Sequence, residues 1–384
     1  MTAPRREDDP EFKLWIEKAK AGSMETAIDL SGFRPNKGCE RSNERVGPCP
    51  ACGGRSDGKP SNRFGVNLFK RKFNCRGCKA KGNNALALAL HGGRIGFLEA
   101  CERLAMEPPP RLVKGEAPAQ KAEREARVAE LKVRADADAE KRRKAEAEAD
   151  AYRLKAARDL WRRAEAGDLA PVMGYLTHER GLDVIGLNLA AIRQAECALT
   201  NARKDALHTG PAMVCAMVDS EGKVTGVHRT WLGPGKDGMR KGRPVVIDPV
   251  TGEPAGTKKG LGLKKGAVIR LVRMTREGEK PRRLFLGEGI ETTLSVYTAL
   301  RKAGSPLLEG SAFWCGIDLG NIAYSVPVPA WCRELILLGD GDSDPHDTRE
   351  ALAACAARFR DAGVTVRIAM APEGQDFNDM LGNS

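Results

Sequence analysis

The chain has 384 residues, of which 41% are hydrophobic and 30% charged, and its formal net charge is +12. This length and composition favour two or three folded domains and argue against a disordered or fibrous chain. No apolar run reaches about 18 residues, and residues 1–10 are charged and lack an apolar stretch, so neither a membrane span nor a signal peptide is expected. We therefore expect a cytoplasmic protein with no membrane partner.

The charge is unevenly distributed along the chain. Residues 36–82 contain 12 basic and 3 acidic residues, and residues 223–283 contain 16 basic and 5 acidic residues. Residues 284–384 contain 7 basic and 14 acidic residues. Basic segments of this density favour a polyanionic partner such as nucleic acid, which an evenly charged soluble surface would not require.

Two Cys-x-x-Cys pairs lie in the first basic segment. Cys49 and Cys52 form the first pair, Cys75 and Cys78 form the second, and 22 residues separate the pairs. In a cytoplasmic protein such pairs bind metal rather than form disulfides, and four thiolates suit one structural zinc ion. The other cysteines lack this pattern and are expected to be small buried residues.

The residues between the two pairs are typical of the hairpin of a zinc ribbon. The ribbon resembles the N-terminal zinc-binding domain of phage and plasmid primases. The resemblance is carried by the Cys-Pro-x-Cys-Gly-Gly knuckle, an Arg-Phe strand, an aromatic residue before the second knuckle and a helix of small residues after it. In those primases this domain contacts single-stranded template, and the aromatic rings could stack on bases beside basic residues. By that resemblance the candidate nucleic-acid contacts are Arg63, Phe64, Lys72 and Phe73. The alternative is that the phenylalanines form the ribbon's own core.

A long charged helix is expected after this domain. The prolines at 108–110 end the preceding helix, because proline removes a backbone donor. Residues 117–166 are rich in Ala, Glu, Lys and Arg, with no proline after Pro118, and so favour a solvated helix. We therefore predict a zinc-ribbon domain at 1–108 and a helical linker at 109–166.

The segment 167–283 is predicted to be a basic α+β domain. Apolar runs at 211–218 and 224–232 predict a β-hairpin, and a glycine- and lysine-rich loop follows it. This pattern resembles the domain that precedes Toprim in phage and plasmid primases. The resemblance implies contacts to the phosphates of template or nucleotides by Arg229, Lys258, Lys259, Lys264 and Lys265, although a flexible loop without specific contacts is the alternative. No Gly-x-x-x-x-Gly-Lys-Ser/Thr motif occurs, so we expect any replicative helicase to be a separate protein.

Two short aliphatic runs in the last hundred residues end in acidic residues. The run at 284–286 leads to Glu288, and the run at 335–338 leads to Asp340 and Asp342. Each run is followed by a helical pattern, so the order is strand, acid, helix, which predicts a parallel sheet with the acids at one edge. Carboxylates this close repel one another unless a divalent cation lies among them, and oxygen ligands suit Mg²⁺ or Mn²⁺.

This arrangement resembles the Toprim domain of primases, topoisomerases and some nucleases, at 284–384. The resemblance implies catalytic roles for Glu288, Asp340 and Asp342 and binding of one to three Mg²⁺ or Mn²⁺ ions. The candidate ligands of these ions are Glu288, Asp340, Asp342, Asp344 and Asp376. Asp376 could instead cap a surface turn. Bacterial replicative primases have another acid where this chain has Thr292, and either Glu291 replaces it or the site dispenses with it.

The expected fold is a multidomain α/β chain with a zinc ribbon, a charged helical linker, a mixed α+β basic domain and a Rossmann-like Toprim domain. The expected function is that of a DNA primase of a phage or plasmid, which makes short primers on single-stranded DNA from nucleoside triphosphates. A Toprim nuclease and a non-catalytic DNA-binding replication module are the alternatives. The sequence leaves open the initiation sequence, the preference for ribo- or deoxynucleotides, the helicase partner and the oligomeric state.

Overall fold

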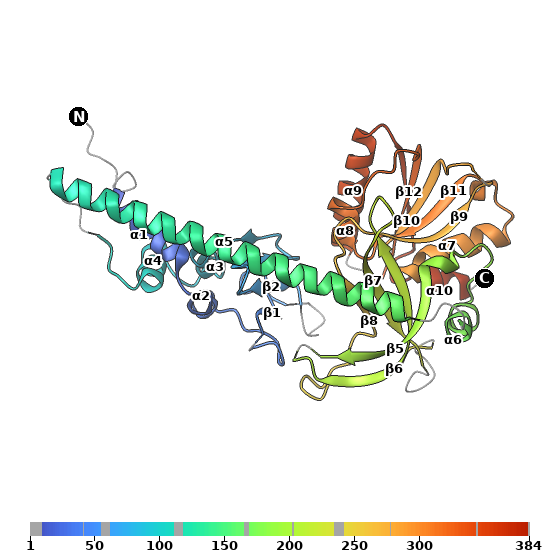
Figure 1. Ribbon diagram of the computed structural model, residues 1–384, viewed down its shortest axis with the longest axis horizontal. Coiled ribbons are helices and arrows are strands. Elements are labelled where there is room, and N and C mark those ends of the chain that lie inside the picture. Colours follow the sequence, from blue (N-terminus) through green and yellow to red (C-terminus); the bar gives the residue numbers. More distant parts are fainter. Residues whose placement is uncertain are drawn as a thin grey trace. The chain divides into compact units, whose positions relative to one another are not determined.

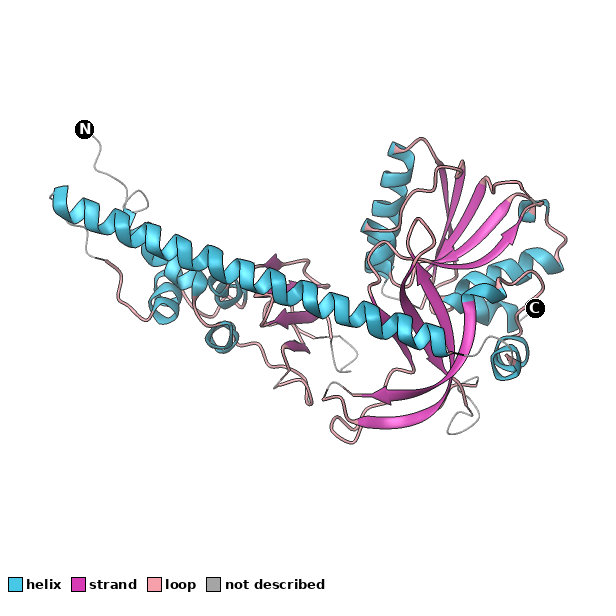
Figure 2. Ribbon diagram, viewed as in Figure 1, coloured by secondary structure: helices cyan, strands magenta, loops and turns pink. Residues whose placement is uncertain are grey.

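The computed structural model (Figure 1) divides into two compact units, Met1–Glu148 and Ala149–Ser384. Both units mix helices and strands (Figure 2), which confirms the predicted multidomain α/β class. Among the described residues, no helix is both long enough and apolar enough to cross a membrane. The described residues are 10–40, 42–54, 62–110, 118–164, 169–201, 203–233, 242–276, 278–342 and 345–382.

The first unit contains a small antiparallel sheet with the strand order β1-β2-β3-β4. Phe64 pairs with Cys75 across β2 and β3, so the hairpin ends at the second cysteine pair. This ribbon confirms the zinc-ribbon prediction, although β1 was not predicted. The strands are β1 (Glu44–Gly47), β2 (Phe64–Asn67), β3 (Lys72–Cys75) and β4 (Lys81–Gly82).

Four short helices supply the core that the ribbon lacks. Helices α1 and α4 contact each other, and so do α2 and α3. Ser23 caps α2 by accepting hydrogen bonds from the backbone N–H groups of Glu25 and Thr26, and Asn84 caps α3 in the same way. The helices are α1 (Pro10–Ala21), α2 (Met24–Ser31), α3 (Ala85–His91) and α4 (Phe97–Ala105).

The predicted charged helix is present as α5 (Pro118–Arg163). Its side chains form ion pairs at helical spacing, such as Arg134 with Glu130 at 2.7 Å, and these exposed pairs support the helix without a hydrophobic face. Near its C-terminal end, Ala157 and Leu160 are buried in the second unit. Local propensity and charge pairing therefore sustain most of this helix, and packing sustains its end.

A four-stranded antiparallel sheet follows, with the order β5-β6-β7-β8. The predicted hairpin is its centre, because β6 and β7 pair from Ala212 with Trp231 to Val218 with Val224. Strand β5 was not predicted from the sequence. The elements of this region are α6 (Ala170–Gly174), the π-helical turn Tyr175–Glu179, the 3₁₀ turn Leu189–Ala191, β5 (Ile192–Thr200), β6 (Ala206–Val218), β7 (Val224–Trp231) and β8 (Lys258–Gly262).

The C-terminal region is built on a five-stranded sheet with the order β13-β12-β10-β11-β9. Strands β13, β12, β10 and β11 are parallel, and β9 pairs antiparallel with β11 at the edge. The strands are β9 (Ile269–Met274), β10 (Arg283–Gly287), β11 (Ser311–Cys315), β12 (Glu334–Gly339) and β13 (Thr365–Met370). The two aliphatic runs are therefore the parallel strands β10 and β12, as predicted, and the structure makes them neighbours in the centre of the sheet.

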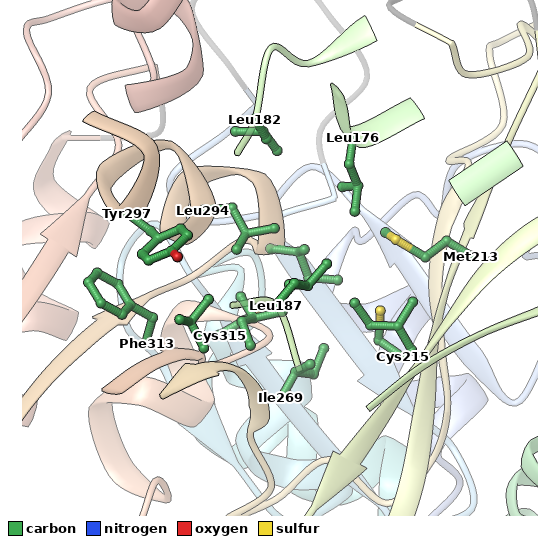
Figure 3. Close-up of a cluster of buried hydrophobic side chains, with 14 of the residues drawn as sticks. Leu176, Leu182, Leu187, Met213, Cys215, Ile269, Leu294, Tyr297, Phe313 and Cys315 are labelled. Carbon is green, nitrogen blue, oxygen red and sulfur yellow. The ribbon is translucent and has the colours of Figure 1, made fainter. Parts of the chain in front are cut away.

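Both faces of this sheet are covered, which explains why its central strands are continuously apolar. Phe285 of β10 belongs to a buried cluster that includes Leu294 of α7 and Met213 of β6, so the two sheets share one core. Figure 3 shows Leu294 and Met213 in this cluster, together with Phe313 of β11. Leu284 of β10 faces the other cluster, which includes Phe359 of α9. The covering helices are α7 (Ile290–Lys302), α8 (Leu319–Tyr324), α9 (Pro345–Asp361) and α10 (Phe377–Gly382), and a 3₁₀ turn spans Pro306–Leu308.

Candidate metal centres and basic surface

Three acidic residues follow the carboxyl ends of adjacent parallel strands. Glu288 follows β10, Asp340 follows β12, and Asp318 lies shortly after β11. Ile317 precedes Asp318 with a φ of 77°, a left-handed conformation that is strained for a β-branched residue. Asp318 then caps α8 by accepting a hydrogen bond of 2.8 Å from the N–H of Asn321. Asp318 was missed from the sequence, although its place after the predicted strand is the same signal that identified Glu288.

A close backbone approach fixes the position of the loop after β12. A Cβ atom on Gly341 would lie 1.9 Å from the carbonyl oxygen of Pro372, so no other residue fits there without movement of the backbone. The N–H of Gly341 also donates a hydrogen bond of 2.9 Å to the carbonyl of Gln375. The flanking residues Asp340 and Asp342 are thereby held against the segment that leads into α10.

Mutual repulsion and burial raise the pKa values of these acids. Burial raises the pKa of Glu288 to about 7, helped by the negative charges of Asp340 and Asp318. Burial raises the pKa of Asp340 to about 6, and the hydroxyl of Thr292 partly offsets this rise. Partial burial and the charge of Asp376 raise the pKa of Asp342. The fold therefore holds carboxylates together at a free-energy cost that a divalent cation would remove.

The donor atoms at this edge are the oxygen ligands that a hard divalent cation prefers, although the carboxylate oxygens of Glu288, Asp340 and Asp342 do not all lie within 4.8 Å of one another. One oxygen of Asp340, Oδ2, accepts a hydrogen bond of 3.0 Å from Thr292, while the buried Oδ1 has no hydrogen-bond partner. A buried acceptor without a partner is costly, and a cation among carboxylate oxygens would satisfy it. The residues that could hold such an ion are Glu288, Asp340 and Asp342. Asp344 lies outside the described residues.

Asp376 is engaged in a helix cap. Its Oδ1 accepts a hydrogen bond of 2.7 Å from the N–H of Asp379, and its own N–H donates to Oδ2 of Asp379 at 3.1 Å. This is the capped turn that was the alternative to a ligand role. Its charge nevertheless raises the pKa values of Asp340 and Asp342, so it lies within electrostatic range of the cluster.

Glu291 does not occupy the place of the missing acid. Its carboxylate accepts a hydrogen bond of 2.6 Å from the hydroxyl of Tyr175 and lies 2.8 Å from Nζ of Lys258. Burial alone would raise the pKa of Glu291, but the Lys258 ammonium and these hydrogen bonds outweigh it and lower the pKa. Thr292, at the position of the missing acid, instead orients Asp340. Glu291 therefore links α7 to β8 and the Tyr175 turn.

The predicted basic residues are dispersed over several environments. Lys258 pairs with Glu291, while Lys259 donates a hydrogen bond of 2.5 Å to the carbonyl of Thr200. Lys264 lies 2.6 Å from Oδ2 of Asp318 and so reaches the acidic cluster, and Lys265 is exposed. Arg229 is partly buried over the ring of Trp231, at 5.1 Å from the ring centroid. Lys258 also lowers the pKa of Asp340. Of the five predicted basic residues, Lys258 and Lys264 are therefore the ones whose charges act on the acidic cluster.

The four predicted cysteines converge in the first unit. The sulfur atoms of Cys49, Cys52, Cys75 and Cys78 all lie within 4.8 Å of one another. The N–H of Cys52 lies 3.5 Å from Sγ of Cys49, and the N–H of Cys78 lies 3.4 Å from Sγ of Cys75, as glycine-containing knuckles allow. Four thiolates at these separations suit one structural zinc ion.

His91 lies beside this site and was missed from the sequence. Its Nε2 atom is 3.2 Å from Sγ of Cys49 and 4.0 Å from Sγ of Cys78. The imidazole stacks on the ring of Phe64, with centroids 5.2 Å apart and planes at 5°, and burial lowers its pKa. A neutral ring that donates from Nε2 would stabilise the Cys49 thiolate. No spacing rule in the sequence connects the end of α3 to the knuckles.

The ribbon aromatics face inward rather than toward solvent. Phe64 is fully buried and Phe73 is 5% exposed, and both rings contact His91. The prediction that these two rings stack on bases is therefore replaced by the alternative, because stacking would require the core to open. Phe69 is 41% exposed, and Lys72 is exposed on β3. Arg63 is half-buried, and its carbonyl accepts a hydrogen bond of 2.7 Å from the N–H of Arg76.

Comparison with known families identifies the C-terminal domain. Residues 283–384 match the model of the Toprim domain, so this part of the chain is a Toprim domain, as predicted. Residues 151–271 match the model of a domain of unknown function (DUF7146). A search of curated proteins returned no match.

Three solved primase structures are similar to the chain at low identity. The Aquifex aeolicus primase (zinc-binding and RNA polymerase domains) shares 15% identity over 93% of this chain and 80% of its own, with a TM-score of 0.36. A DnaG primase catalytic domain bound to single-stranded DNA shares 12% identity over 61% of this chain and 78% of its own, with a TM-score of 0.37. The Escherichia coli primase catalytic core shares 14% identity over 57% of this chain and 72% of its own, with a TM-score of 0.35. TM-scores this low carry no argument about function.

Proposed function

We propose that this protein is a DNA primase, which synthesises short primers on single-stranded DNA by nucleotidyl transfer. The observation that carries the proposal is the acidic edge of the Toprim sheet, where Glu288 and Asp340 are held together with raised pKa values. The four converging cysteines of the first unit and the basic segment before the Toprim domain support a nucleic-acid substrate. The proposed context is phage or plasmid replication.

The side chains at this edge have different proposed roles in the reaction. Glu288, with a pKa of about 7, is suited to accept the proton of the attacking 3′-hydroxyl at neutral pH. Asp340 and Asp342 are the proposed ligands of Mg²⁺ or Mn²⁺, and Thr292 orients Asp340. When bound, the metal supplies neutralisation of the developing phosphate charge and a lower pKa for the attacking hydroxyl.

Basic residues bind the polyanionic reactants. Lys264 pairs with Asp318, and Lys258 pairs with Glu291. These two lysines are the proposed contacts for the phosphates of the incoming nucleoside triphosphate. Each carboxylate holds its lysine in place. Arg229, Lys259 and Lys265 are the proposed contacts for the template backbone. In the first unit, Arg63 and Lys72 are proposed to contact single-stranded template beside the zinc site, with a separate helicase as partner.

A primer-synthesis assay tests this proposal. Zinc-loaded protein would be incubated with mixed-sequence single-stranded DNA, labelled nucleotides and Mg²⁺ or Mn²⁺, alongside a 5′-labelled DNA strand. The proposal predicts short new products and an intact labelled strand. Metal-dependent shortening of the labelled strand without new products would instead identify a Toprim nuclease. Binding without either reaction would identify a non-catalytic module.

A further inference from the structure

A cavity of about 450 Å³ lies at the antiparallel edge of the five-stranded sheet, on the side of β9. In Figure 1 this edge is the one formed by β9 and β11. The acids Glu288 and Asp340 do not line it. A volume of this size is typical of sites for small ligands. Its lining includes Arg270, Arg273, Trp314 and Trp331.

Two indole rings form an aromatic corner in this cavity. The rings of Trp314 and Trp331 meet edge to face, with centroids 5.5 Å apart and planes at 87°. Trp314 is nearly buried, whereas Trp331 is partly exposed. Neither indole N–H donates to a protein acceptor within the described part of the chain, although tryptophan N–H groups away from water usually find a partner. The corner therefore offers an aromatic surface together with two donors.

Two guanidinium groups add positive charge to this cavity. Arg270 lies over the ring of Trp314 at 5.3 Å and donates hydrogen bonds to the carbonyl oxygens of Asp219 and Ser220. Burial lowers the pKa of Arg270, and the negative charge of Asp219 partly offsets this. Arg273, which is exposed, donates a hydrogen bond of 2.8 Å to the hydroxyl of Thr275 and another to the carbonyl oxygen of Glu279. Across the described ranges, neither guanidinium has a carboxylate within 4.0 Å, so neither is held in an ion pair.

We propose that this cavity binds a nucleotide, with the base against the tryptophan corner and the phosphate at Arg273 and Arg270. The combination of aromatic rings, unpartnered indole donors and guanidinium groups that form no ion pair suits a flat, acceptor-rich ring that carries negative charge. The nucleotide is either free or one unit of a single strand, since both present the same chemistry. The site goes beyond the proposed primase activity and does not depend on it.

Binding measurements with two probes test the proposal. Full-length, zinc-loaded protein would be titrated with mant-ATP and, separately, with a short fluorescein-labelled single-stranded DNA. The site variants are Arg273→Gln and Trp331→Leu, and the matched control is Arg276→Gln, which removes an exposed arginine nearby. We expect each site variant to weaken binding of one probe by about tenfold, the size of a lost stacking or charged contact, and the control to leave it unchanged.

The outcomes separate the two sources of the ligand. An effect on mant-ATP alone identifies a site for a free nucleotide, and an effect on the DNA alone identifies a contact for a strand. Unchanged affinity for both probes in both site variants overturns the proposal.

A control variant separates this inference from the proposed function. Asp340→Ala/Asp342→Ala should lose primer synthesis and still bind the probe at the cavity. Because Trp331→Leu changes a partly buried residue, its circular dichroism would be compared with that of the wild type. Arg273→Gln changes an exposed side chain and tests the proposal even if the tryptophan variant does not fold.

Discussion

Replacing Asp340 with asparagine should stabilise the metal-free chain at neutral pH. Asparagine keeps an oxygen that can accept the hydrogen bond from Thr292 but carries no charge. Burial first, and then the charges of Asp342 and Asp376, raise the pKa of Asp340 from 3.8 to about 6. A shift of this size corresponds to about 3 kcal/mol. Because the side chain is partly exposed, solvent screening reduces the expected gain to about 1–2 kcal/mol.

The pH dependence of this effect follows from the direction of the shift. A carboxyl whose pKa is higher in the folded state destabilises that state when it ionises. The penalty is absent below the unfolded pKa of about 4, grows as the pH rises toward about 6, and is constant above that. The advantage of Asp340→Asn should therefore be full at pH 8 and about half as large at pH 5.

Thermal unfolding of the zinc-loaded chain, without added divalent cation, measures this difference. A gain of about 1–2 kcal/mol should raise the Tm of the unit that contains residue 340 by about 2–8 °C at pH 8. Added Mg²⁺ should raise the Tm of the wild type more than that of the variant, because the ion relieves the same repulsion. A variant that is no more stable than the wild type at pH 8 would show that the charge of Asp340 does not destabilise the folded state.

Two further predictions concern the zinc site and the pair between Lys258 and Glu291. His91→Phe keeps a ring on Phe64 but removes the donor to Cys49, so zinc affinity in a chelator competition should fall about 10-fold to 100-fold. His178→Phe, on an exposed residue, is the control, and equal affinities of the two variants would contradict a role for His91. Lys258→Met leaves the buried Glu291 without its cation and should cost about 2–3 kcal/mol of unfolding free energy, more than Lys265→Met on an exposed side chain. Adding Glu291→Gln should recover part of that loss, and no recovery would show that the pair is not the cause.

The parts of the fold that were predicted are those that local sequence patterns determine. The aliphatic runs of β10 and β12 are apolar at every position because helices cover both faces of the sheet, and that pattern is visible without any tertiary information. The helix α5 can be predicted for a similar reason, since its alternating charges and the absence of proline from its interior determine its secondary structure. The cysteine pairs are equally local, because each knuckle is a four-residue turn.

The parts that were not predicted depend on which face of an element is covered. Phe64 and Phe73 sit in a basic hairpin that suggests base stacking, but α3 places His91 against both rings and makes them core residues. Likewise, Glu291 is adjacent to the acidic edge in sequence, yet the helical turn directs it to Tyr175 and Lys258. Such outcomes are set by packing between elements far apart in the chain, which residue spacing does not reveal.

The acidic edge of the Toprim domain is proposed to catalyse primer synthesis. The most direct test compares Asp340→Ala/Asp342→Ala with a control that has the same spacing, Asp136→Ala/Asp138→Ala on the exposed face of α5. Both would be assayed with mixed-sequence single-stranded DNA, labelled nucleotides and Mg²⁺ or Mn²⁺. We expect the Asp340/Asp342 variant to make no primers while it still folds and binds DNA, and the control to make them at the wild-type level. Continued primer synthesis by the Asp340/Asp342 variant would show that these acids are not the catalytic site.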